Sequence, residues 1–244
     1  MTVSFRIAAT IFNCLPHAIS WFIQRRNHER NDLDERTRAG LNFTIIVNSA
    51  FFLEGSLEAG LSSLLSQRLL DQEQSNLFVS RLAEDLESRI KTATGSATYD
   101  ALFKIILGTP ASSLQEVSPF WEGIAVLFHL RNVLAHGRAV SWSVEFPGDK
   151  FPPDFNGPCD EAFKGGYKKV QDYLLKKKVI SKRFTDQSWE LFFLTDEIAD
   201  HFWSLTLNFI VGVSNSLTGG DQQAFKSAIM YDDLVQLRAI AQQK

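Results

Sequence analysis

Several residue types that mark specialised protein classes are scarce in this chain of 244 residues. Its two cysteines, Cys14 and Cys159, lie far apart without a CxxC partner, which argues against a disulfide framework and a cysteine-based zinc site. The same scarcity favours a reducing cytoplasm. The five histidines show no HExxH or other close ligand spacing, so we expect neither a metal nor another cofactor. Glycine-rich phosphate loops and the GxSxG hydrolase motif are also missing.

Long apolar runs are missing as well. Residues 7–23 are largely apolar, but Asn13, Pro16 and His17 interrupt them, and the pair Arg25-Arg26 follows the stretch instead of preceding it. A packed helix, kinked or broken at Pro16, is therefore favoured over a targeting segment. No stretch reaches the roughly 18 uninterrupted apolar residues of a membrane helix, so no membrane partner is expected. The net charge of −3 argues against a protein that coats nucleic acid by charge alone, although it allows a local basic patch.

Helical periodicity dominates what is present. The hydrophobic share of 45% and the charged share of 22% are ordinary for a chain long enough to bury a core. Ser118-Pro119 is a good helix start, and Gly137 is well placed as the stop of the same helix. Apolar residues recur at steps of three and four, which predicts helices over about 34–70, 77–90, 99–107, 118–134, 162–178 and 195–217, followed by a small C-terminal helix. The expected fold class is all-α, an antiparallel helical bundle.

After residue 138 the helical periodicity gives way to a different sequence pattern. Residues 141–146 and 189–194 alternate between apolar and polar types, which predicts two short strands that could pair as a small β-hairpin. Proline and glycine fill residues 146–158, which predicts a loop. We therefore expect one domain with an N-terminal helical extension (1–33), a bundle core (34–138 and 195–218) and an insertion (139–194) that carries the loop and a basic helix.

The pattern Arg131-Asn132-x3-His136 contains residue types suited to phosphoryl transfer. Histidine exchanges a proton near neutral pH, whereas arginine stays charged and binds phosphate oxygens through paired hydrogen bonds. Asn132 could orient either side chain. These are the parts needed to cut RNA without a metal. A base takes the 2′-hydroxyl proton, the oxygen attacks the adjacent phosphate, and a cation stabilises the charged transition state.

Chance and geometry both bear on this pattern. A random chain of this composition contains an Arg-x4-His spacing about 0.27 times, and about 0.01 times when asparagine must follow the arginine. Five residues turn an ideal helix by about 500°, which leaves the two side chains roughly 140° apart. They share one site if the helix frays near Gly137 or if a second chain completes the site. The alternative is that both basic side chains cap the helix carbonyls and favour the helix dipole.

In a helical chain, Arg131-Asn132-x3-His136 resembles the signature of HEPN domains, in which a polar residue follows an arginine and a histidine stands four to six positions after it. The resemblance implies an all-α bundle, frequently dimeric, with the motifs of two chains meeting at one cleft. Many members are metal-independent ribonucleases of toxin–antitoxin or anti-phage systems, and others are non-catalytic interaction or nucleotide-binding modules. It implies that Arg131 stabilises phosphate, Asn132 orients, and His136 is the acid/base. It covers residues 42–137 and 195–217 and leaves 1–40 and 140–190 unexplained.

Some toxin members of this family carry a tyrosine two residues after the histidine. Arg138 stands there in this chain, which argues against a tyrosine-regulated toxin and adds a candidate for phosphate binding. Glu54 falls on the apolar stripe of the predicted helix 34–70 and could pair with Arg131 and position it. The alternative for Glu54 is a carboxylate at the edge of the core with another local partner.

A basic segment lies between residues 164 and 183, where eight lysines and arginines face one acid. It could follow an RNA backbone, and the alternative is a solvated helix face. The candidates for substrate binding in this segment are Lys168, Lys169, Lys176 and Lys177.

The favoured interpretation is a metal-independent endoribonuclease that acts as a homodimer, with RNA as substrate and an antitoxin or other regulatory protein as a further partner. Two alternatives stay open. One is a non-catalytic HEPN-type binding module, and the other is a regulatory helical protein whose N-terminal helix faces a lipid or a partner.

Overall fold

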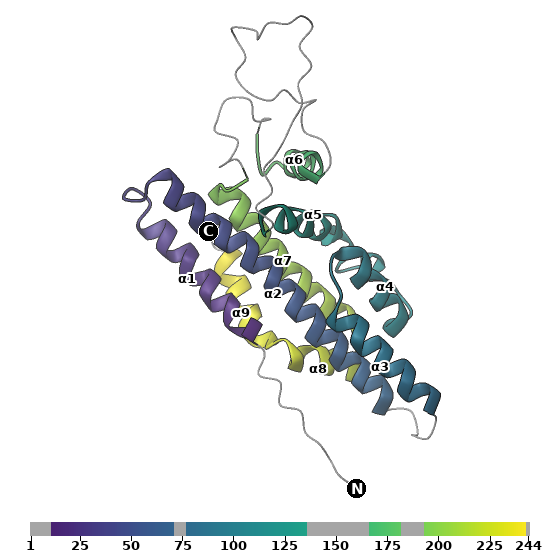
Figure 1. Cartoon of the computed structure of the whole chain (residues 1–244). Helices are drawn as coiled ribbons and strands as arrows, with labels where there is room; N and C mark the ends of the chain where they lie inside the picture. Colours follow the sequence, from purple (N-terminus) through teal and green to yellow (C-terminus); the bar gives the residue numbers. More distant parts are fainter. Residues whose placement is uncertain (1–10, 71–76, 136–165, 182–192, 243–244) are drawn as a thin grey trace, which may run out of the picture.

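The computed structural model describes the chain except for residues 1–10, 71–76, 136–165, 182–192 and 243–244 (Figure 1). In the described ranges every regular element is a helix, which confirms the all-α class. The first predicted strand (141–146) and most of the second (189–194) lie outside the described residues. The elements are a 3-10 helix η1 (Ile11–Cys14), α1 (Leu15–His28), α2 (Glu35–Leu70), α3 (Leu77–Lys91), α4 (Ser96–Leu107), η2 (Ala111–Ser113), α5 (Ser118–Ala135), α6 (Gly166–Lys176), α7 (Asp196–Ser216), α8 (Gly219–Ala228) and α9 (Tyr231–Gln242).

The long helix α2 lies at the centre of this arrangement. Figure 1 shows it as a diagonal rod with α1 along one side and α7 behind it, and α5, α6 and α8 complete the same packed cluster. Because several helices pack on α2, its apolar residues cover more than one face, including Ile45, Leu53 and Leu61, which are fully buried. Phe52 of α2 packs against Trp203 of α7 with ring centroids 6.0 Å apart.

Local signals explain where the helices begin and end. The hydroxyl of Thr195 accepts a hydrogen bond from the Ile198 N–H and caps the start of α7, while Gly108 adopts a left-handed conformation just past α4. Pro16 lies in the first turn of α1, where a missing N–H costs nothing, so of the predicted kink or break the structure shows a helix start that follows the 3-10 helix η1. The C-terminal part forms the two helices α8 and α9 instead of the one expected.

Two helical glycines allow close approach around α5. A Cβ on Gly123 would lie 2.2 Å from the hydroxyl of Tyr173, so the glycine lets α6 pack tightly against α5. A Cβ on Gly212 would lie 2.5 Å from the carbonyl oxygen of Glu116, so α7 packs directly on the segment that leads into α5. The first contact joins the basic helix α6 to α5, and the second joins α7 to the segment before α5.

A buried ion network joins α1, α2 and α7 at the start of α7. The Arg26 side chain has no exposed surface and donates through Nη2 to both carboxylate oxygens of Asp200, at 2.7 and 2.8 Å. Its Nη1 donates to Asn42 Oδ1 at 2.8 Å. Asn42 in turn donates to Asp196, which also pairs with Arg38. The pKa of Asp196 is lowered despite the opposing effect of burial, because hydrogen bonds from Arg38 and Asn42 and the charge of Arg26 stabilise its carboxylate.

Candidate functional site

The structure places Arg131 in the last turns of α5, where it points toward the middle of α2. The preceding residue, Leu130, is fully buried, and Arg131 emerges at the edge of the same packed surface. There its Nη2 donates to Glu54 of α2, and the two side chains are only 13% and 18% exposed. The pairing of Glu54 with Arg131 is therefore present as a half-buried contact between two helices.

The guanidinium of Arg131 is held from several directions. Its Nη1 donates to the side-chain oxygen of the neighbouring Asn132 at 2.9 Å, and its Cζ lies 5.7 Å from the centroid of the Phe51 ring. The Nε atom is buried and has no hydrogen-bond partner in the structure. Such a set of neighbours limits the orientations open to the guanidinium, which is what a group that must meet a phosphate in one geometry requires.

Burial shapes the electrostatics of this contact. Burial raises the pKa of Glu54, and the charge and hydrogen bond of Arg131 counteract that rise only in part. Burial also raises the pKa of Tyr99, with smaller contributions from the nearby carboxylates of Glu54 and Glu58 and an opposite one from Arg131. Tyr99 is thus a neutral hydroxyl beside the ion pair, and it donates to the carbonyl of Ala93 at 3.3 Å.

The histidine of the predicted motif is not among the residues that the structure describes. His136 and Arg138 fall outside the described residues, which resume at residue 166. The geometry between Arg131 and His136 therefore stays a prediction. What the structure brings together is Arg131 with Glu54 and Asn132.

The basic helix α6 has two distinct faces. Val170, Tyr173 and Leu174 are buried against the core, whereas Lys169, Lys176 and Lys177 are exposed. Lys176 forms an ion pair with Glu122 of α5 at 2.8 Å. The side chain of Lys168 lies outside the described part. The lysines thus occupy the solvent face of an amphipathic helix.

The basic helix α6 packs on α5 at a different place from Arg131. Helix α6 meets α5 around Glu122 and Gly123, whereas Arg131 lies nine residues later and turns toward α2. At 1.5 Å per residue this is roughly 13 Å along the helix axis. Nine residues also turn the helix by about 900°, so Glu122 and Arg131 leave opposite sides of α5, and the two regions do not form one compact pocket.

A partly buried histidine on α7 contacts the basic helix α6. His201 of α7 shares a hydrogen bond of 2.9 Å between its Nε2 and the hydroxyl of Tyr173, which connects α6 to α7. Burial, assisted by the nearby charge of Lys177, lowers the pKa of His201 to about 4. His201 is therefore neutral at pH 7.

This pKa predicts a pH dependence of stability. Because the folded-state pKa of His201 lies below the ordinary value near 6.5, the unfolded chain binds more protons between about pH 6.5 and 4. The stability is complete above pH 6.5 and is lost as the pH falls, by about 2 kcal/mol between pH 7 and 4.5. Urea titrations at these two pH values, with wild type and His201→Asn, measure the effect. An equal loss in both proteins would contradict the role of His201.

Among the described residues, no three His, Cys, Asp or Glu side chains converge to hold a metal ion. None of the described helices combines the length and the apolar character needed to cross a bilayer. Comparisons of the chain with protein-family models, with curated proteins and with solved structures found no match.

Proposed function

We propose that this protein is a metal-independent endoribonuclease of the HEPN type, whose site combines Arg131 and His136 and is completed by a second copy of the chain. The observation that supports this most is the anchoring of Arg131. The arginine of the motif is paired with Glu54 of another helix and flanked by Asn132, with 13% of its side chain exposed. These contacts fix the guanidinium in one orientation, as a group that stabilises a transition state requires.

The chemistry follows from the residue types. His136 would take the proton from a ribose 2′-hydroxyl, and the resulting oxygen would attack the adjacent phosphorus. The bond to the 5′-oxygen would break, and that oxygen would take a proton from the protonated His136 of the second copy, which leaves a 2′,3′-cyclic phosphate and a 5′-hydroxyl end. Arg131 would balance the negative charge that grows on the phosphate oxygens, and Asn132 would orient the guanidinium. A homodimer supplies the second histidine or arginine that the helical spacing calls for.

The proposed substrate and partners follow from the same features. The exposed lysines Lys169, Lys176 and Lys177, together with Lys168 and Arg138, would bind the RNA backbone through its phosphates. A toxin–antitoxin or anti-phage role in the cytoplasm would require a further protein that restrains the nuclease. That protein would be an antitoxin or another regulator.

The second candidate is a non-catalytic HEPN-type binding module. The observation that favours it is the same contact read as packing, because the ion pair with Glu54 and the ring of Phe51 stabilise α2 against α5 whether or not RNA is cut. This candidate predicts a stable dimer without nuclease activity.

An RNase assay in EDTA tests the proposed function. Wild type is expected to cut single-stranded RNA and leave 2′,3′-cyclic phosphate ends, and His136→Ala is expected to lose this activity. His129→Ala is the matched control, since His129 is an exposed histidine on α5, seven residues before His136 in the sequence. Cutting that survives in His136→Ala, or wild type that cuts nothing at micromolar concentrations, would refute the proposal.

A further inference from the structure

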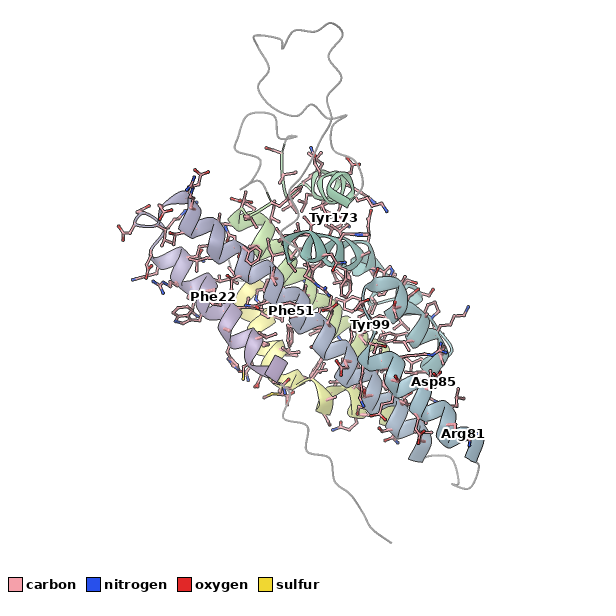
Figure 2. The ribbon with its side chains drawn as sticks, in the orientation of Figure 1. Phe22, Phe51, Arg81, Asp85, Tyr99 and Tyr173 are labelled. Carbon is pink, nitrogen blue, oxygen red and sulfur yellow. The ribbon has the colours of Figure 1, made fainter. Side chains whose placement is uncertain are left out.

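Beside Arg131 lies an aromatic ring that contacts the guanidinium and is still largely open to solvent. Phe51 is 43% exposed, although the chain has ample core in which to bury it, and both of its neighbours toward the C-terminus, Phe52 and Leu53, are almost wholly buried. Figure 2 labels Phe51 midway along α2.

The position of the ring relative to the charges is specific. The Arg131 guanidinium lies 5.7 Å from the ring centroid, and Glu54 stands one turn further along α2 and pairs with the same arginine. Asn132 is exposed on the other side of the guanidinium. A flat apolar surface therefore adjoins a cation and an amide group, with one face of the ring region left to solvent.

An aromatic ring beside an arginine matches the base and the phosphate of a nucleotide. Aromatic rings bind single-stranded nucleic acid by stacking on the bases, while arginines bind the phosphates between them. We propose that Phe51 stacks on a base of the RNA strand and so positions the adjacent phosphate at Arg131. This inference rests on the proposed function, and it assigns to Phe51 a role in substrate positioning and not in the chemical step.

If Phe51 binds a base, its removal should change KM much more than kcat. Phe51→Ala should raise KM for single-stranded RNA about tenfold and leave kcat within about threefold, because stacking contributes to binding before the chemical step. Phe51→Trp should restore the wild-type KM, since it keeps a stacking surface. An effect on folding alone would not be rescued in this way.

A matched control is available on α1. Trp21 is 51% exposed and the guanidinium of Arg25 lies 5.4 Å from its ring centroid, so it reproduces the exposed aromatic–arginine pair away from α5. Trp21→Ala should leave KM unchanged. Binding is measured by fluorescence anisotropy in a His136→Ala background, which keeps the RNA intact, with an oligoadenylate and an abasic oligomer of the same length. The Phe51→Ala change should weaken binding of the first and not of the second.

The outcomes separate this inference from the proposed function. Wild type that neither binds nor cuts RNA would overturn both. Wild type that cuts RNA, with an unchanged KM in Phe51→Ala, would overturn the role of Phe51 and leave the nuclease standing. A loss in Phe51→Ala that vanishes at higher protein concentration, together with a smaller dimer fraction in light scattering, would assign the ring to subunit contact and also overturn the inference.

Discussion

Replacement of Arg26 by alanine is expected to lower the free energy of unfolding by about 3 kcal/mol. The guanidinium is completely buried between α1, α2 and α7, and it satisfies Asn42 and Asp200 and supports Asp196. Removal of this one partner leaves the polar groups of Asn42 and Asp196 in a site from which water is largely excluded, and it leaves a cavity as well. Urea unfolding followed by circular dichroism measures the loss.

The neighbouring arginine is the control for this prediction. Arg25 is 48% exposed and pairs with Glu29 one turn later, so Arg25→Ala should cost less than about 0.5 kcal/mol. Arg26→Lys should fall between the two variants, because lysine keeps the charge but cannot reach Asp200 and Asn42 with a planar fork. Equal losses in Arg25→Ala and Arg26→Ala would show that the buried network contributes nothing beyond a surface pair.

The order of the helices could be predicted from the sequence because their signals are local. Residues 34–70 repeat apolar side chains at helical spacing without a proline, and the observed α2 covers Glu35–Leu70. Ser118-Pro119 predicted the start of α5, and the structure begins that helix at Ser118. Close approaches such as Gly212 on Glu116 could not be predicted, because they depend on which helices become neighbours.

In the candidate site, too, some contacts could be predicted from local sequence patterns and others could not. A charged residue on an apolar stripe indicates a buried partner, and this signal led to Glu54 and its pairing with Arg131. The same signal was present at Arg26, which follows the buried Ile19 and Ile23 at steps of four and three, but it was overlooked. Its partner Asp200 lies 174 residues away, and no local pattern identifies such a partner. The exposure of Phe51 could not be predicted either, because a stripe of apolar residues predicts burial and does not show where no neighbouring helix covers it.

The pair of Arg131 and Glu54 provides the test that separates a nuclease from a binding module. Arg131→Ala should lower kcat for RNA by about 100- to 1,000-fold if the guanidinium stabilises the transition state. Arg131→Lys should recover little of this rate, because an ammonium group does not reproduce the planar contact with phosphate. If the arginine only holds α2 against α5, the stability falls and no rate depends on it.

A double-mutant cycle tests whether Glu54 acts by positioning the guanidinium of Arg131 or through its own charge. Glu54→Gln keeps an oxygen acceptor for Arg131 but leaves the guanidinium without its counter-ion, so we expect a loss of stability with kcat within about threefold of wild type. Glu54→Ala removes the acceptor and should lower kcat about tenfold by freeing the guanidinium. In an Arg131→Ala background the Glu54→Ala change should have no further effect on kcat, because its action passes through the arginine. Additive losses in the double variant, or an unchanged rate in Arg131→Ala, would contradict the positioning role and leave the contact as packing between two helices.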